Sequence, residues 1–353
     1  MSTSTRITAH AELTTSLSLL SDHELAELVA SATPLGTGIG GRSALVEVDG
    51  RRVFVKRVPL TDLERRPENV RSTANLFDLP PYFHYGIGSP GLSAWRELAV
   101  HAMTTNWVLA DRFAGFPLMH HWRVLPDTPQ PLPAQLADVE RSVAYWGGSP
   151  AVRERLEGLR TASASLALFL EYIPQTLHDW FDDRLRTAEA DTACALVERR
   201  LAELTGFLGG SELLHFDAHF QNILTDGRQL YLADYGLSLS SRFRLTPQER
   251  VFFDRHRRYD RDYTTRHLVI WLVTALHDLR GPERDAFVRR CADGTQPQGG
   301  IPRVAADIIS RYARPTAVMD EFVRRLHEES RLTPYPDKAL RSAAQGAGTP
   351  ASR

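Results

Sequence analysis

The sequence predicts an α+β protein in which a small β-rich part is followed by a larger helical part. Residues 33–56 contain two glycine-bearing turns between short apolar runs, a pattern typical of antiparallel strands joined by hairpins. The run 165–171 is short and apolar, as expected of a buried strand. Residues 190–208 have the length and apolar content of a buried helix, and we expect mainly helices in the lobe that follows.

Composition and turn signals divide the chain into four parts. They are an extension with a short helix (1–32), a β-rich lobe (33–170), a hinge and helical lobe (171–335) and a disordered tail (336–353). Residues 1–20 are polar and expected to be loose, whereas Ser21 and Glu24 form a capping box that begins the short helix. A proline-rich connection opens an inserted helical segment at about 127–164, which the glycines at 147–148 divide.

Composition excludes several classes of function. The chain has 353 residues, 42% of them hydrophobic, and a net charge of −1, so it has no basic excess for nucleic acid or for a membrane surface. Its two cysteines provide neither a disulfide framework nor a metal cluster. The apolar run at 268–276 is too short to span a bilayer, and the first residues lack the pattern of a signal peptide. We therefore expect a soluble, cytoplasmic protein.

Two short motifs carry the strongest functional signal. The first places His215, Asp217 and Asn222 in the order His-x-Asp-x4-Asn, and the second is Asp234-Tyr-Gly. An Asp-Gly turn at 226–227 between two apolar runs predicts a hairpin that brings these side chains to one edge. Asp217 can take a proton from a hydroxyl, and Asn222 and Asp234 can hold a metal ion. Either motif alone would indicate only a turn, but their ordered combination favours phosphoryl transfer with magnesium.

The amino-terminal half contains a possible phosphate cradle. Gly36, Gly38 and Gly41 fit the pattern Gly-x-Gly-x-x-Gly, which here leads into a strand and a hairpin. A dinucleotide-binding fold would instead continue from its glycines into a helix. Small residues let backbone amides approach a triphosphate, and Lys56 at the end of the third strand can neutralise its charge.

Lys56 is unusual because the chain takes nearly all of its positive charge from arginine. The only other lysine is Lys338. A compact ammonium group fits against phosphate oxygens as a point charge, which a planar guanidinium does not do. The alternative is that Lys56 is an ordinary surface residue of its strand.

In this order, the motifs resemble those of the protein-kinase-like superfamily, which includes aminoglycoside and choline phosphotransferases as well as protein kinases. The resemblance covers about residues 33–335. It implies a bilobal fold with a small antiparallel-sheet N-lobe and a larger helical C-lobe. It also implies an enzyme that uses ATP and magnesium to phosphorylate an alcohol.

The resemblance implies a role for each motif residue. Asp217 would orient the acceptor hydroxyl and take its proton, while His215 would brace the loop. Asn222 and Asp234 would hold Mg²⁺, and Lys56 would bind the phosphates.

The usual partner of such a lysine is a glutamate on the next helix. Ser89 and the proline after it predict the start of a helix that carries Glu97, our candidate. Glu64 and Glu68 remain alternatives, because the segment before this helix is longer than the superfamily usually has.

The run that ends in Glu171-Tyr-Ile173-Pro resembles the hinge strand of the superfamily. The resemblance implies that the Glu171 carbonyl and the Ile173 amide bind the adenine of ATP. A buried strand without a ligand is the alternative.

Two residues beside Asp217 bear on the acceptor. His219 occupies a position where aminoglycoside and choline kinases typically have histidine and protein kinases have lysine. Phe216 stands where regulated protein kinases carry an arginine for a phosphorylated loop. A small-molecule acceptor is therefore favoured, a bacterial serine/threonine protein kinase is the alternative, and a nucleotide-binding pseudokinase that works by protein contact is the third possibility.

Overall fold

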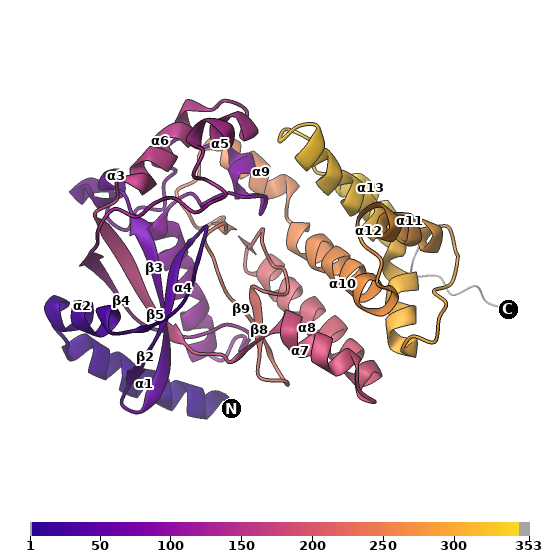
Figure 1. Cartoon of the computed structure of the whole chain (residues 1–353), viewed down its shortest axis with the longest axis horizontal. Helices are drawn as coiled ribbons and strands as arrows, with labels where there is room; N and C mark the ends of the chain where they lie inside the picture. The colour runs from indigo at the N-terminus through magenta and orange to yellow at the C-terminus, as the bar shows by residue number, and fades with distance from the viewer. Residues whose placement is uncertain (1, 346–353) are drawn as a thin grey trace. The chain divides into compact units, whose positions relative to one another are not determined.

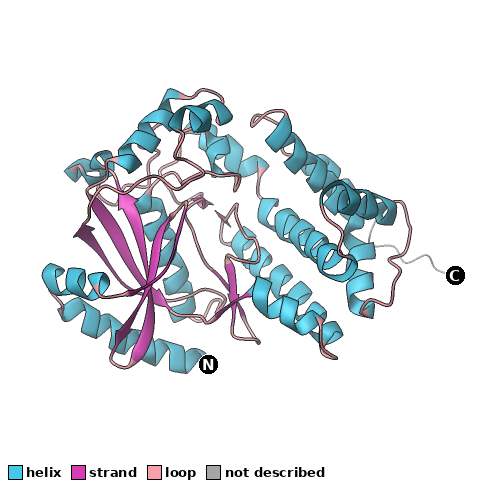
Figure 2. Cartoon of the chain, viewed as in Figure 1, coloured by secondary structure: helices cyan, strands magenta, loops and turns pink. Residues whose placement is uncertain are grey.

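The computed structural model describes residues 2–345 and shows a mixed α+β protein, with one five-stranded antiparallel sheet and many helices (Figures 1 and 2). The chain forms two compact units. The first unit holds the residues up to Pro174 together with Ala233–Arg250, and the second holds Gln175–Leu232 and the chain from Val251 onward. The expected α+β class is confirmed.

The sheet of the first unit has the strand order β1-β2-β3-β5-β4, and every neighbouring pair is antiparallel. Its strands are β1 (Thr33–Gly38), β2 (Gly41–Val48), β3 (Arg51–Leu60), β4 (Met119–Pro126) and β5 (Ala164–Glu171). The β2–β3 turn has positive φ at both Asp49 (51°) and Gly50 (70°), the geometry that Asp-Gly favours in a two-residue hairpin. The strand that was expected at 165–171 is β5, and it is buried over nearly its whole length.

Two helices, α1 (Thr3–Leu19) and α2 (Asp22–Ala30), pack along this sheet (Figure 1). The capping box at Ser21 is confirmed. The expectation of a loose chain over 1–20 was wrong, because α1 buries Leu13 and Leu17 against the sheet. A polar sequence with apolar residues at helical spacing gains this helix from tertiary contacts rather than from its own propensity.

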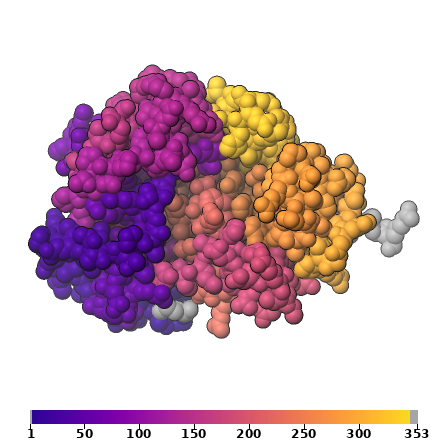
Figure 3. Space-filling model, viewed as in Figure 1, coloured from indigo at the N-terminus to yellow at the C-terminus, as the bar shows by residue number. Residues whose placement is uncertain are grey.

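The remaining helices of the first unit are α3 (Asp62–Arg65), α4 (Ala94–Leu109), α5 (Val139–Tyr145) and α6 (Pro150–Arg160), with 3₁₀ turns at Pro67–Asn69 and Pro81–His84. The predicted break between the two inserted helices is confirmed. In the space-filling view the inserted helices, coloured magenta, lie on the visible surface of this unit (Figure 3). Helix α4 begins later than predicted, since its N-cap is Ser93 rather than Ser89. Gly91, with φ +82°, breaks the chain between the two serines.

The second unit is mainly helical, as expected, with a small sheet of strand order β6-β8-β9. Its elements are β6 (Gln175–Thr176), α7 (Leu177–Leu185), α8 (Ala190–Gly210), β7 (Leu213–Leu214), β8 (Ile223–Thr225), β9 (Leu230–Leu232), α10 (Tyr259–His277), α11 (Gly281–Ala292), α12 (Arg303–Glu328) and α13 (Asp337–Gln345). In the first unit, β10 (Leu239–Ser240) precedes α9 (Pro247–Arg255), which carries the chain into the second unit.

The expected disorder of 336–353 was wrong for Asp337–Gln345, which forms α13 and buries Leu340 completely. The rest of that expectation, residues 346–353, lies outside the described residues. No described helix has both the length and the apolar content that crossing a membrane requires.

Candidate functional site

Lys56, Glu97 and Asp234 form an ion-pair cluster inside the first unit. The Lys56 Nζ atom donates to Glu97 Oε1 at 2.7 Å and to Asp234 Oδ1 at 2.8 Å. These residues come from β3, from α4 and from the loop after β9. The Glu97 side chain is 2% exposed, whereas that of Asp234 is 45% exposed. One ammonium thus joins a buried carboxylate to a carboxylate that remains accessible to a ligand.

The charge of Lys56 is stabilised by its two partners. Burial opposes the charged form, but the attraction of Asp234 and Glu97 outweighs burial and raises the pKa of Lys56. The ammonium is therefore protonated at any physiological pH, and the cluster as a whole carries one net negative charge. Such a site favours a cation bound at the half-exposed carboxylate of Asp234.

The structure pairs Lys56 with Glu97 rather than with either alternative. Glu97 lies in the first turn of α4, where a carboxylate is also favoured by the helix dipole. Glu64 is engaged elsewhere: its carboxylate accepts from Arg155 at 2.8 Å and from the backbone N–H of Ala94 at 2.9 Å. Burial opposes the charged form, but Arg155 and the hydrogen bonds from Thr61 and Ala94 together outweigh burial and lower the pKa of Glu64.

The glycine turn lies directly beside this cluster. The β1–β2 hairpin closes between Gly38 and Gly41. A Cβ atom on Gly40 would lie 3.5 Å from Lys56 Nζ, and one on Gly41, with φ +134°, would lie 2.3 Å from the Arg57 carbonyl oxygen. Gly41 therefore has to be glycine. Gly40 was missed by the sequence pattern, although the Gly-Gly pair marks the closest approach of this turn to the lysine.

By contrast, Cβ atoms on Gly36 and Gly38 would meet nothing within 4 Å. The backbone at these two positions is open on that side. Both glycines therefore fit a loop that approaches a bulky ligand, but the fold itself does not require them.

Residues of the expected hinge lie at the end of β5. The N–H of Ile173 makes no hydrogen bond to the described residues. The Glu171 carboxylate accepts two bonds from Arg6 of α1, at 2.8 and 2.7 Å, and a third from the Leu118 N–H at 3.1 Å. Arg6 also donates to the carbonyl of Phe116 at 2.6 Å. Arg6 was missed because nothing in a polar amino-terminal segment marks it as the partner of a residue 165 positions away.

Asp234 has a left-handed backbone, with φ 62°. Such a conformation is uncommon for a residue with a side chain and is concentrated at functional loops. The next residue, Tyr235, is fully buried, and its ring meets the ring of His101 edge-on at 4.6 Å. His101 lies one helical turn after Glu97, and its Nε2 atom is 3.9 Å from Glu97 Oε1. The i,i+4 spacing from Glu97 was the signal that could have found it.

In the second unit, Asp217 and Asn222 meet within one loop, here called the Asp217 loop (residues 215–222). The Asn222 amide nitrogen donates to the Asp217 backbone oxygen at 3.0 Å and to its Oδ2 atom at 3.1 Å. His215 accepts from the Asp217 N–H through Nδ1 at 3.2 Å. His219 Nε2 lies 3.7 Å from Asp217 Oδ2. Asn222 and His219 thus both lie against the Oδ2 atom of Asp217, while His215 holds its backbone, an arrangement that suits a base.

Asp260 of α10 anchors the start of this loop. Its carboxylate accepts from the N–H groups of His215 at 2.7 Å and Phe216 at 2.8 Å. Burial raises the pKa of Asp260 to about 6, although these two bonds act in the opposite direction. Phe216 has φ 67° and packs its ring 4.8 Å from that of Tyr259. An aromatic residue in this backbone region is a true outlier, so the anchor and the packing together hold a strained loop.

The donor set fits magnesium in part. Among the described residues, no group of three or more His, Cys, Asp and Glu side chains gathers as a metal site. Mg²⁺, however, is commonly held by one or two carboxylates together with substrate phosphates and water. Asp234 offers a half-exposed carboxylate, and Asn222 donates through its nitrogen, which leaves its amide oxygen as the ligand atom. They belong to different units, and each is suited to the role within its own unit.

The predicted site residues thus gather in two sets, each within one unit. Lys56, Glu97 and Asp234 meet in the first unit, while His215, Asp217 and Asn222 meet in the second. No family model matches this sequence, and a search of curated proteins found no match either.

Proposed function

We propose that this chain is an ATP- and magnesium-dependent phosphotransferase of protein-kinase-like, bilobal fold, and that it phosphorylates the hydroxyl of a small molecule. The observation that carries this proposal is the ion-pair cluster. A lysine buried on the third strand, rare in an arginine-rich chain, joins a glutamate of the following helix to the aspartate of Asp-Tyr-Gly. A core salt bridge needs only one carboxylate, whereas this cluster adds a second one that is 45% exposed.

In the first unit, the nucleotide binds through groups that are already in position. Lys56 neutralises phosphate charge, and the open backbone at Gly36 and Gly38 lets amide groups approach the phosphates. The Glu171 carbonyl and the Ile173 N–H hydrogen-bond the adenine. Asp234 would hold magnesium, which would offset negative charge on the phosphates. In the second unit, the amide oxygen of Asn222 is the group suited to the same role.

In the second unit, Asp217 receives the proton. As the acceptor oxygen bonds to the γ-phosphorus, the bond from that phosphorus to the bridging oxygen breaks, and ADP leaves with that electron pair. The acceptor O–H bond breaks at the same time, and its proton passes to the Asp217 carboxylate. Asn222 bonds the carboxylate and His215 bonds the backbone N–H of Asp217, so that little reorganisation is needed.

Phe216 supports a small-molecule acceptor over a protein acceptor. Its ring is fully buried among aromatic side chains, including those of Phe252 and Tyr259. No cation stands at this position to bind a phosphorylated loop, which is how regulated protein kinases order their peptide site. A serine/threonine protein kinase remains the alternative function.

The test is incubation with γ-labelled ATP and Mg²⁺, alone and with cell lysate separated by size. We expect the label to move to a molecule in the small-size fraction with the wild-type chain and not with Asp217→Asn. Label on protein would favour the alternative function. Equal nucleotide binding by both forms without any label transfer would sink the proposal and favour a pseudokinase.

A further inference from the structure

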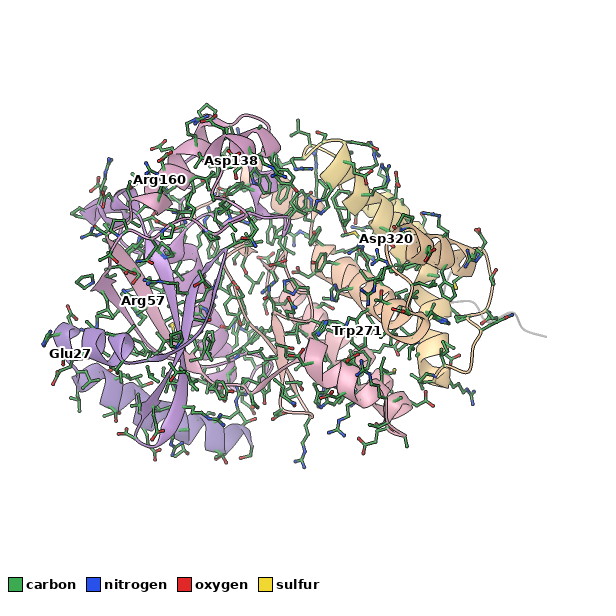
Figure 4. The ribbon with its side chains drawn as sticks, viewed as in Figure 1. Glu27, Arg57, Asp138, Arg160, Trp271 and Asp320 are labelled. Atoms are coloured by element: carbon green, nitrogen blue, oxygen red, sulfur yellow. The ribbon has the colours of Figure 1, made fainter. Side chains whose placement is uncertain are left out.

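Helix α10 presents a row of three aromatic side chains with polar tips. Tyr263, His267 and Trp271 are spaced four residues apart, so they lie on one face of the helix. All three are half-buried. The rings of Tyr263 and His267 are nearly parallel, with centroids 6.3 Å apart. We call these three residues the α10 row; Figure 4 labels Trp271 among the helices of the second unit.

The α10 row adjoins the Asp217 loop. His267 lies edge-on to Phe220, with ring centroids 4.6 Å apart, and its ring is 6.3 Å from that of His219. Phe220 also contacts Trp271, at 5.8 Å. Since His219 itself is 3.7 Å from the Asp217 carboxylate, the row runs from the neighbourhood of the base along the helix. A ligand lying on it would reach Asp217 with one end.

The polar tips of the row have no hydrogen-bond partner among the described residues. This holds for the Tyr263 hydroxyl, both His267 ring nitrogens and the Trp271 indole N–H. Tyr and Trp normally satisfy these groups when they are buried, and here partial exposure leaves them available to a ligand. Phe181 stacks on Trp271 and Tyr259 stacks on Tyr263, so the exposed remainder of each ring and its polar tip are what a ligand can contact. Such a surface can bind a molecule that has both apolar and polar parts.

The charges around the row do not favour a cation. Burial is the largest cause that lowers the pKa of His267 to about 3, and the neighbouring His219, Arg266, His178 and Arg284 side chains act in the same direction. His267 is therefore neutral at pH 7, and no carboxylate is among its significant neighbours. Arg266 and Arg284 are paired with Asp320 and Asp285, so the charges beside His267 are balanced, and the row itself offers only neutral polar tips. Asp217 and Asp260 are the acidic groups that act on Tyr263 at the other end. Asp260 accepts from the N–H groups of His215 and Phe216, and the proposed role of Asp217 is to accept a proton.

We propose that the α10 row binds the ring of an uncharged polyol, such as a sugar or nucleoside, and presents one of its hydroxyls to Asp217. The inference rests on the proposed function and specifies its acceptor. The aromatic rings cover the apolar faces of the polyol, while the free tips bond to its hydroxyls. A polycationic aminoglycoside and a quaternary ammonium alcohol are both disfavoured acceptors.

The test begins with binding in the absence of ATP. Isothermal titration with glucose, myo-inositol and uridine, and with kanamycin and choline as cationic probes, measures affinity independently of chemistry. We expect at least one uncharged probe to bind, and Trp271→Ala to weaken it about tenfold, since stacking on one aromatic residue is worth 1–3 kcal/mol. Phe287→Ala, a half-buried aromatic change on α11, should leave this affinity unchanged.

Two conservative variants protect the test against misfolding. Tyr263→Phe and His267→Gln remove or alter a polar tip with little change in packing, and each should weaken binding of the same probe. The inference is overturned if no uncharged probe binds, if these variants and Trp271→Ala bind as wild type does, or if a cationic probe binds more tightly than all of the uncharged ones.

The experiments distinguish a failure of the proposed acceptor from a failure of the proposed phosphotransferase activity. Binding of an uncharged probe that Trp271→Ala weakens, without label transfer from ATP, would contradict the phosphotransferase and leave the binding site intact. Label transfer to kanamycin, choline or a protein, unaffected by Trp271→Ala, would support the phosphotransferase. It would overturn the inference that the acceptor is an uncharged polyol bound on the α10 row.

Discussion

The ion-pair cluster of the first unit and the Asp217 loop of the second hold their side chains by different means. In the cluster, Lys56 bonds directly to carboxylates that lie 41 and 178 positions away in the sequence. In the loop, Asn222 and His215 act within five residues of Asp217, and through backbone atoms as well as side chains. The cluster thus depends on tertiary structure, and the loop mainly on its own backbone path.

This difference has an energetic consequence. Removing one partner of a buried ion pair leaves an uncompensated charge in a medium that solvates it poorly. A backbone-held loop loses less when one side chain changes, because its remaining bonds still define its path. We therefore expect substitutions in the cluster to affect ligand binding together with catalysis, and substitutions of the loop side chains to affect catalysis alone.

The largest expected effect is that of Asp217→Ala. The substitution removes the proposed base while the loop remains anchored through Asp260, so turnover should fall by a factor of about 10² to 10⁴. Nucleotide affinity, measured by titration, should stay close to wild type. Asp183→Ala, at an exposed carboxylate of α7, is the matched control and should turn over normally. If Asp217→Ala lost nucleotide affinity as well, the contrast between the two regions would not hold.

Lys56→Arg tests the cluster with no change of net charge. A planar guanidinium cannot occupy the point between Glu97 and Asp234 that the compact ammonium fills, and a displacement of about 1 Å at such a site can cost about a hundredfold in rate. We expect both turnover and nucleotide affinity to fall. Lys338→Arg, in α13, provides the same substitution elsewhere and should be neutral. Normal activity in both variants would mark Lys56 as an ordinary strand residue.

The sequence predicted the loop better than the cluster, because the loop's signal is local. His215, Asp217 and Asn222 lie within eight residues of one another and contact each other directly, so their spacing in the sequence already predicts these contacts. The choice of Glu97 over two other glutamates needed the path of a long connection, which no local pattern fixes. For the same reason the sequence predicted Ser89 as the N-cap of α4, whereas the N-cap is Ser93.

Residues that act through distant partners could not be predicted from the sequence. Arg6 is a typical helix residue until the fold brings Glu171 to it. His101 differs, because it lies four residues after Glu97 on the same helix and the i,i+4 spacing was available as a signal. Helices α1 and α13 were missed for a related reason, since each owes its stability to apolar residues that find a partner only in the folded unit.

Arg6→Ala tests whether removing one partner of another buried ion pair in the first unit is also costly. The Arg6 and Glu171 side chains are 2% and 13% exposed, so removing the guanidinium leaves a carboxylate with little access to water. We expect the free energy of unfolding, from urea denaturation, to fall by about 3–5 kcal/mol. Arg51→Ala, which breaks an exposed pair with Glu12, should cost no more than about 1 kcal/mol. Equal costs for the two variants would mean that burial does not decide the strength of these pairs.

The smallest expected effect concerns the two hydrogen bonds that Asp260 of α10 accepts from the start of the Asp217 loop. The pKa of Asp260 is raised to about 6 from an ordinary value of 3.8, so the folded protein holds this proton more tightly than the unfolded chain does. The stability linked to this proton is complete below about pH 4 and is lost as the pH rises to about 6, amounting to about 3 kcal/mol at most. Above that range the wild-type carboxylate is charged, and its burial opposes folding.

Asp260→Asn removes this titration and also one of the two acceptor oxygens, which leaves the N–H of His215 or of Phe216 without its bond. At pH 4 the variant should therefore be less stable than wild type by about 1–3 kcal/mol, the cost of an unsatisfied buried donor. The difference should shrink as the pH approaches 7, because only the wild type then carries a buried charge. Urea denaturation from pH 4 to pH 7 measures the difference in stability at pH 4 and its change with pH, with Asp183→Asn as an exposed control. A difference that does not vary with pH would show that folding leaves the pKa of Asp260 unchanged, and no difference at any pH would show that the loop is held without this anchor.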